Sequence, residues 1–230
     1  MIPVVKVPAK PYIDIFYHEL SWRNSCKNLR GMNYLAHAYL SFGQPQLLVG
    51  NMISDFVKGR KKNDYPALIY QGIMLHRAID NFTDTHNATR EAKGFFKDDY
   101  GLYSGAFIDI VYDHFLAKNE SLFSPGGLQL FADKIYRSLE QQQEYLPDRF
   151  LMLLPHMKHQ NWLFNYRLSD GVRNSFRGLV HRAAYMHDSA RAFEIFLENY
   201  TQLEMISGIF LPDVERFAKE QYNKIMTGWS

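Results

Sequence analysis

The segment HRAIDNFTDTH, from His76 to His86, contains residues that are able to bind a metal ion and a phosphate. In a helix, His76, Asp80 and Asp84 would lie at i, i+4 and i+8, so their side chains would line one face. Arg77, next to His76, carries a planar guanidinium group that suits a phosphate. The spacing therefore predicts half of a metal–phosphate site.

Three further segments also place acids, amides or histidines among apolar residues. They are His37 in NYLAHAYLSF, Asn51 and Asp55 in GNMISDFVKG, and Asp109, Asp113 and His114 in IDIVYDHFL. A buried carboxylate must be paired, hydrogen-bonded or bound to metal, because an isolated buried charge is very unfavourable. We therefore hypothesise that the four segments meet at one site.

Each of these residues also has an ordinary structural explanation. An isolated buried histidine such as His37 is more often a hydrogen-bonded core residue than a metal ligand. Asp55 could pair with Lys58 or Arg60 at helical spacing, and Asp84 could be a surface residue near a helix end. Four such groups on four apolar segments together favour the metal site.

The predicted donors limit both the metal and the chemistry. Histidine and carboxylate without cysteine favour Mn²⁺, Fe²⁺, Zn²⁺ or Mg²⁺ over copper(I) or an iron–sulfur cluster. Ligands drawn from several helices are typical of a helical metallohydrolase. Such a metal polarises a phosphoryl oxygen and lowers the pKa of a bound water. A metal phosphohydrolase is therefore the function that these residues favour.

Apolar residues at helical spacing predict the elements that must carry the site. Gly59 is expected to end the first helix, and Asp64 and Asn87 are expected to cap the next two. No run of alternating β-branched residues indicates a strand, so we expect an all-α, multi-helix bundle. The predicted helices cover residues 44–59, 64–84, 87–98, 104–119, 126–144, 147–157, 170–182, 187–200 and 212–227.

Composition places the chain among ordinary globular proteins. It has 230 residues, of which 47% are hydrophobic and 22% charged, and its formal net charge of +2 is too small to indicate non-specific nucleic-acid binding. Cys26 is the only cysteine, which excludes an intrachain disulfide and a thiolate metal site. No apolar run is long enough to span a membrane, so we expect a soluble, cytoplasmic protein.

Residues 1–31 differ from the rest of the chain. They contain three prolines and a polar stretch, SWRNSCKNLRG, before a second methionine at Met32. We expect residues 1–31 to be a dispensable extension, either a short appended helix around 12–22 or the product of an upstream start codon. Residues 32–230 are expected to form one helical domain.

Four motifs together resemble one known family. MNYLAHAYLS, GNMISDFVKG, MLHRAIDNFTD and DIVYDHFLAKN resemble, in order and spacing, the acyl carrier protein phosphodiesterase family, from Met32 to about residue 220. The resemblance implies an all-helical fold distantly related to HD-type metal phosphohydrolases. It also implies hydrolysis of the phosphodiester that joins 4′-phosphopantetheine to a serine of holo acyl carrier protein, with Mn²⁺ as the metal.

The resemblance also implies which residues form the site. Asp55 matches the family's essential aspartate, although the chain lacks a contiguous His–Asp pair because Asp113 and His114 reverse that order. The predicted metal ligands are His37, Asp55, His76, Asp80 and Asp113. The predicted catalytic residues are Asp55, His76, Arg77 and His114.

A basic run follows the segment that carries Asp55. It consists of Lys58, Arg60, Lys61 and Lys62. Such a run is usually a solvated turn, but acyl carrier proteins are acidic around the modified serine, so we expect it to bind the holo carrier protein. Two alternatives remain open: a related phosphohydrolase acting on a small phosphoester or nucleotide, and a non-catalytic module that binds carrier protein.

Overall fold

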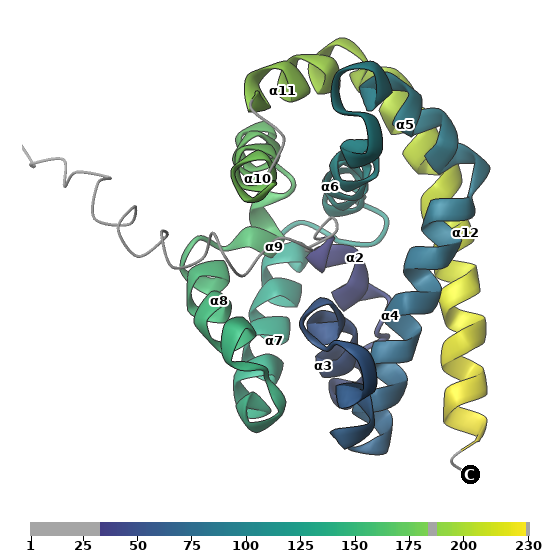
Figure 1. Cartoon of the computed structure of the whole chain (residues 1–230), viewed down its shortest axis with the longest axis vertical. Helices are drawn as coiled ribbons and strands as arrows, with labels where there is room; N and C mark the ends of the chain where they lie inside the picture. Colours follow the sequence, from purple (N-terminus) through teal and green to yellow (C-terminus); the bar gives the residue numbers. More distant parts are fainter. Residues whose placement is uncertain (1–32, 184–187, 229–230) are drawn as a thin grey trace, which may run out of the picture.

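The computed structural model describes residues 33–183 and 188–228, and this part of the chain is helical, without a β-strand. The expected all-α fold is therefore confirmed (Figure 1). The predicted extension, 1–31, lies outside the described residues. No helix in the described part of the chain is both long enough and apolar enough to cross a membrane.

The α-helices differ widely in length, and short 3₁₀ helices (η) join several of them. The α-helices are α2 (Tyr34–Tyr39), α3 (Pro45–Ile53), α4 (Ala67–Thr85), α5 (Asn87–Tyr100), α6 (Ser104–Ala117), α7 (Gly127–Gln141), α8 (Asp148–His159), α9 (Trp162–Asn165), α10 (Ser169–Arg182), α11 (Ser189–Glu198) and α12 (Tyr200–Thr227). The 3₁₀ helices are η1 (Ser54–Phe56), η2 (Gly59–Asp64), η3 (Gly101–Tyr103) and η4 (Gln143–Tyr145).

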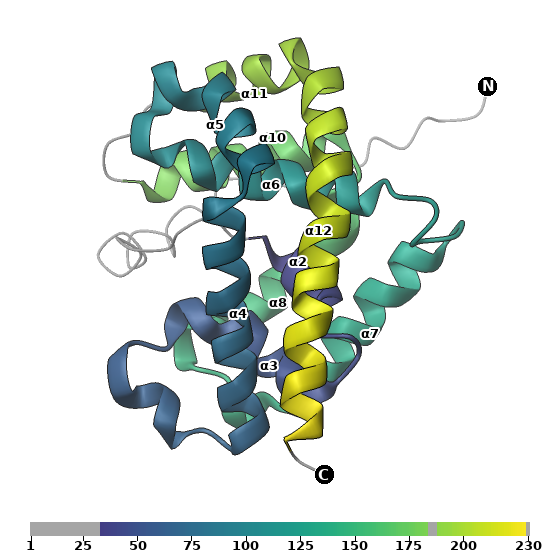
Figure 2. The ribbon, with the colours of Figure 1, turned by 90° about the vertical axis from the view of Figure 1, so that its right-hand side faces the viewer.

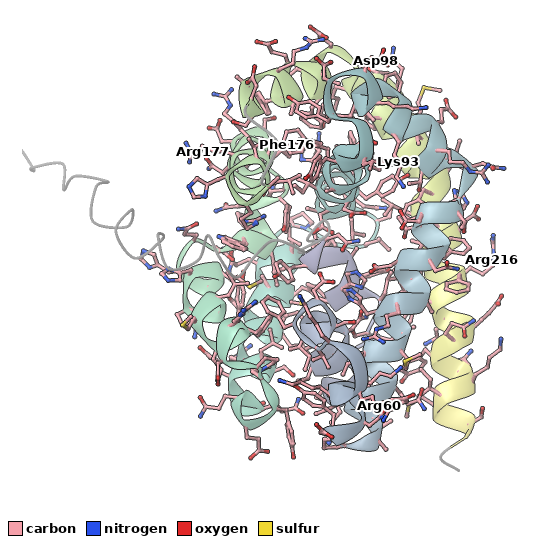
Figure 3. All side chains as sticks on the ribbon, in the orientation of Figure 1. Arg60, Lys93, Asp98, Phe176, Arg177 and Arg216 are labelled. Atoms are coloured by element: carbon pink, nitrogen blue, oxygen red, sulfur yellow. The ribbon has the colours of Figure 1, made fainter. Side chains whose placement is uncertain are left out.

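The long helix α12 runs beside α4 and α5 along one side of the molecule (Figures 1 and 2). Aromatic side chains from α5, α6 and α10 pack together in the core: the ring of Phe107 stacks on Phe96 at 5.3 Å and meets Phe176 edge-on at 5.0 Å. On α10, Phe176 is buried and its neighbour Arg177 is exposed (Figure 3). This alternation is the amphipathic pattern that predicts these helices.

Helices α3 and α4 pack unusually closely, through two glycines. A Cβ atom on Gly50 would overlap the carbonyl oxygen of Ile69, and one on Gly72 would overlap the carbonyl oxygen of Leu47. Only glycine permits this contact between two backbones. As a result, the last turn of α3 lies directly against the helix that carries His76 and Asp80.

The start and end of several helices differ from the sequence prediction. The helix expected over 44–59 ends at Ile53, because the chain tightens into η1 and becomes extended at Val57, where φ is −103° and ψ is 102°. Asp64 does not cap α4, which begins after Pro66. Asn87 is the first residue of α5, and the cap is His86, whose Nδ1 accepts a hydrogen bond from the Ala88 N–H at 3.2 Å.

The last helix is much longer than expected. The sequence predicts a helix over 212–227, but α12 starts at Tyr200 and includes Pro212, although a proline normally begins or breaks a helix. Both Pro212 and Gly208 are exposed, so the missing helical hydrogen bond between them lies at the exposed face of the helix. The helix therefore tolerates its interior proline without burying an unpaired group.

Candidate active site

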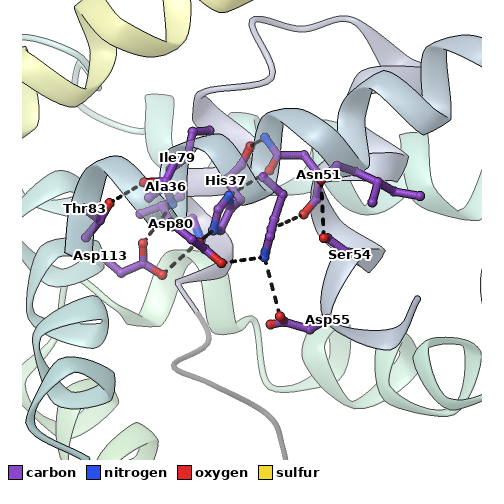
Figure 4. A network of polar contacts seen from close by, with 12 residues as sticks. Ala36, His37, Asn51, Ser54, Asp55, Ile79, Asp80, Thr83 and Asp113 are labelled. Carbon is purple, nitrogen blue, oxygen red and sulfur yellow. Dashed lines mark hydrogen bonds and ion pairs between the residues drawn. The ribbon is translucent and has the colours of Figure 1, made fainter. Parts of the chain in front are cut away.

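His37, His76 and Asp80 form a compact group at the junction of α2 and α4 (Figure 4). The Nε2 atom of His37 lies 3.3 Å from Oδ1 of Asp80, and the Nε2 atom of His76 lies 3.2 Å from Oδ2. The two imidazole rings stack at 3.9 Å. One ligand atom from each residue lies within 4.8 Å of the others, so these three residues are able to hold a metal ion.

Asp55 lies at the edge of this group. Because α3 ends at Ile53, the tight turn of η1 directs Asp55 toward α4, where its Oδ1 is 3.5 Å from Nε2 of His76. The set of mutually close ligand atoms does not include Asp55. The predicted ligand is thus beside the group, within reach of His76.

Exposure gives the site a closed side and an open side. The side chains of His37 and His76 are only 2% and 7% exposed, whereas those of Asp55 and Asp80 are 23% and 37% exposed. The imidazoles therefore form the floor, and the carboxylates face solvent. A substrate must approach from the carboxylate side.

The pKa values of the two imidazoles are shifted in opposite directions. Burial lowers the pKa of His76, but hydrogen bonds to Asp55 and Asp80 outweigh it and raise the pKa to about 10. Burial, and then the neighbouring His76, lower the pKa of His37. His76 is therefore the protonated ring and His37 the neutral one. A cation that binds here must displace the His76 proton.

The two Nδ1 atoms are held by oxygens of a single residue, Asn51. His37 Nδ1 lies 2.7 Å from the side-chain Oδ1 of Asn51, and His76 Nδ1 lies 2.7 Å from its backbone oxygen. Since these oxygens accept, both Nδ1 atoms donate, and the Nε2 lone pair of neutral His37 faces Asp80. That buried Nε2 has no hydrogen-bond partner among the described residues. An imidazole lone pair opposite a carboxylate is favourable only with a cation or proton between them, so the donor set fits a metal.

Asp113, a predicted metal ligand, binds the start of α2 in this structure. Its oxygens accept hydrogen bonds from the backbone N–H groups of Leu35 at 3.0 Å and Ala36 at 2.8 Å, and its side chain is fully buried. It therefore caps the first turn of α2 from the neighbouring helix α6. This contact positions His37, and Asp113 is not among the residues whose ligand atoms form the close group.

His114 has partners outside the group at both of its ring nitrogens. Its Nδ1 donates to the backbone oxygen of Tyr166 at 2.7 Å, and its Nε2 lies 2.9 Å from the hydroxyl of Tyr200. Burial lowers its pKa to about 4. Both ring nitrogens thus have partners elsewhere, and the structure does not bring His114, a predicted catalytic residue, into the group of mutually close ligand atoms.

Two further predicted residues also have local partners. Arg77 donates from Nη2 to the backbone oxygen of Val57 at 3.1 Å and so anchors the segment after Asp55. Asp84 forms an ion pair with Lys93 at 2.8 Å at the exposed end of α4. The column His76, Asp80 and Asp84 is therefore split: its first two members join the group, and the third lies outside it.

Asn51 is the member of the network that the sequence did not assign. The sequence shows Asn51 four residues before Asp55, but an asparagine among apolar residues gives no sign of which side chain it contacts.

Asp109, on α6, is half-buried, and burial, then nearby Asp80 and Asp84, raise its pKa well above the usual value. It makes no ion pair among the described residues.

Comparison with known proteins agrees with these motifs. The family model described as acyl carrier protein phosphodiesterase matches residues 32–214. A protein named acyl carrier protein phosphodiesterase from Yersinia pestis is 30% identical over 191 residues, covering 83% of this chain and 99% of the relative. One of the same name from Klebsiella pneumoniae is 32% identical over 194 residues, with the same coverage. No solved structure matches the chain. The chain belongs to the acyl carrier protein phosphodiesterase family of enzymes.

Proposed function

We propose that this protein hydrolyses the phosphodiester that joins 4′-phosphopantetheine to a serine of holo acyl carrier protein, giving apo carrier protein and 4′-phosphopantetheine. The observation that supports it most is the group of His37, His76 and Asp80, whose ligand atoms lie within 4.8 Å of one another. The names of the relatives indicate acyl carrier protein as the substrate. Histidine and carboxylate ligands from neighbouring helices also support a distant relationship to HD-type phosphohydrolases.

In this proposal, His37, His76 and Asp80 hold a divalent cation, with Mn²⁺ as the metal. When bound, such a cation would polarise a phosphoryl oxygen and lower the pKa of a water molecule. In this structure Oδ1 of Asp55 lies 3.5 Å from Nε2 of His76, at ion-pair distance from the protonated ring. Once His76 has lost that proton, Asp55 is available to orient a water molecule on the open side and to accept its proton.

The carrier protein would be held by a basic lip, which we define as Lys58, Arg60 and Lys61. All three are exposed and directly follow η1, which carries Asp55. Lys62 differs, because its ammonium lies 3.5 Å from the sulfur of Met74 and 5.7 Å from the ring centre of Tyr70. We therefore narrow the predicted basic patch to the lip. Its charge complements an acidic carrier surface.

The direct test is mass spectrometry of holo carrier protein incubated with this protein and Mn²⁺. We expect loss of the phosphopantetheine group and release of free 4′-phosphopantetheine. Chelation should stop the reaction, and added Mn²⁺ should restore it. An unchanged carrier mass with metal-loaded protein would contradict the proposal. Turnover of small phosphodiesters alone would instead support the phosphohydrolase alternative.

A further inference from the structure

We propose that Asn51 is the positioning residue of the metal site: it fixes the direction and the tautomer of both imidazoles at once. The inference rests on the proposed metal site, but it concerns a residue that would not touch the metal. Asn51 is fully buried in the last turn of α3, and Figure 4 shows it on the far side of His37 from Asp80.

The orientation of the Asn51 amide follows from its other contacts. Its Nδ2 donates to the backbone oxygen of His37 at 2.9 Å and to Oγ of Ser41 at 3.1 Å. The hydroxyl of Ser41 donates in turn to the His37 oxygen at 2.8 Å. A flipped amide would place oxygen against oxygen, so Oδ1 must face the His37 ring.

This orientation determines where the hydrogen of His37 lies. Oδ1 can only accept, so the Nδ1 atom of His37, at 2.7 Å, carries the hydrogen. A neutral imidazole then has its lone pair on Nε2, which points toward Asp80. Without Asn51 Oδ1, the Nδ1 of His37 would lose its acceptor, and the hydrogen would move to Nε2, opposite the Asp80 carboxylate.

The backbone of the same residue orients the second imidazole. Carbonyl oxygens in the last turn of a helix lack their full set of helical partners, which leaves the Asn51 oxygen able to accept from Nδ1 of His76 at 2.7 Å. That distance depends on the close packing of Gly50 against α4. One asparagine beside one glycine therefore aligns two ligands from two helices.

The two contacts can be separated by mutation. Asn51→Ala removes Oδ1 but keeps the backbone oxygen, so His37 loses its support and His76 keeps its own. Asn51→Asp, as the buried neutral acid, keeps an acceptor opposite His37 and a hydroxyl that donates to the His37 backbone oxygen in place of Nδ2. Ser41→Ala is the matched control, because it removes two hydrogen bonds of the same buried network without touching an imidazole ring.

The experiment has two readouts on the chelator-treated full chain. Calorimetric titration with Mn²⁺ should show affinity about ten- to a hundredfold weaker for Asn51→Ala than for the wild type, and nearly unchanged for Asn51→Asp and Ser41→Ala. Nitrogen-15 NMR of the side chains should place the hydrogen of His37 on Nδ1 in the wild type and in Asn51→Asp, but on Nε2 in Asn51→Ala.

The outcomes separate this inference from the proposed function. If the wild type binds no Mn²⁺, the metal site fails, while the NMR tautomer still decides the role of Asn51. Equal affinity for Asn51→Ala and the wild type would overturn the inference, and so would an equal loss in Ser41→Ala. If Asn51→Ala does not fold, Asn51→Asp decides: loss of the Nδ1 hydrogen or of the metal in that variant refutes the positioning role.

Discussion

His37 and His114 are both buried histidines, yet only one of them lies in the candidate site. Each directs Nδ1 at an oxygen 2.7 Å away, Oδ1 of Asn51 for His37 and the backbone oxygen of Tyr166 for His114. They differ at Nε2. In His114 it meets the Tyr200 hydroxyl, whereas in His37 it faces Asp80 without a hydrogen bond. What distinguishes His37 as a candidate ligand is the Nε2 atom without a hydrogen-bond partner, because burial and an Nδ1 contact are common to both histidines.

The largest effect is expected from removing the carboxylate of Asp80, which lies close to both His37 and His76. Asp80→Ala should abolish Mn²⁺ binding and reduce turnover by about three orders of magnitude, because the metal accounts for several kcal/mol of transition-state stabilisation. Steady-state hydrolysis of holo carrier protein measures the effect. Asp84→Ala is the matched control one turn further along α4, and it should behave like the wild type. Comparable losses in both variants would mean that the whole column, rather than the group, is required.

The close contact between α3 and α4 at Gly50 and Gly72 should be sensitive to a single added methyl group. Gly72→Ala would force a methyl group against the Leu47 carbonyl and should lower the free energy of unfolding by about 3 kcal/mol or more, by separating α3 from α4. Gly94→Ala, at an exposed helical position with open space around it, should raise stability by about 0.5–1 kcal/mol. Chemical denaturation compares the two. A stable Gly72→Ala variant with normal metal affinity would show that the close contact does not position the site.

Low pH should destabilise the fold by protonating His114, and this effect should be independent of metal binding at the group. The folded pKa of His114 is about 4, below its usual 6.5, so the unfolded chain takes up the proton first as the pH falls. The stability that neutral His114 contributes is therefore present above pH 6.5 and is lost between about pH 6.5 and 4, roughly 2 kcal/mol by pH 5. His114→Asn should flatten this part of the stability curve and leave Mn²⁺ affinity unchanged. A parallel loss of metal binding would return His114 to the site.

High pH should destabilise the protein through His76, whereas low pH destabilises it through His114. The folded pKa of His76 is raised to about 10, so its contribution to stability is complete below pH 6.5 and is lost as the pH rises toward 10. In chelator-treated protein, unfolding at pH 7 and pH 10 should show this loss in the wild type and a smaller one in His76→Asn. An identical alkaline loss in both proteins would contradict the ion pairs with Asp55 and Asp80.

The sequence predicted most helices because their apolar periodicity is local. It also placed His76 and Asp80 together, since a histidine and an acid four residues apart must share a face of α4, whereas His37 was joined to them only through the hypothesis that the segments meet and through the family resemblance. It could not predict that Asp113 caps α2 or that His114 meets Tyr200, because those partners are far away in the chain. The role of Asn51 depends on a backbone oxygen and a close helix contact, and neither leaves a sequence signal.

The smallest expected effect concerns the basic lip, which distinguishes substrate capture from the chemistry of the group. Arg60→Glu combined with Lys61→Glu should raise the KM for holo carrier protein severalfold and leave kcat nearly unchanged. The reason is that exposed charges mainly steer association, and salt screens them over about 8 to 10 Å. A small phosphodiester should be hydrolysed as before. The matched control reverses Lys97 and Arg177, which are also exposed, and Arg177 lies far from Arg60 (Figure 3). If that control raises KM equally, net charge rather than the lip attracts the carrier. If the lip variant loses activity on both substrates, these residues belong to the active site itself.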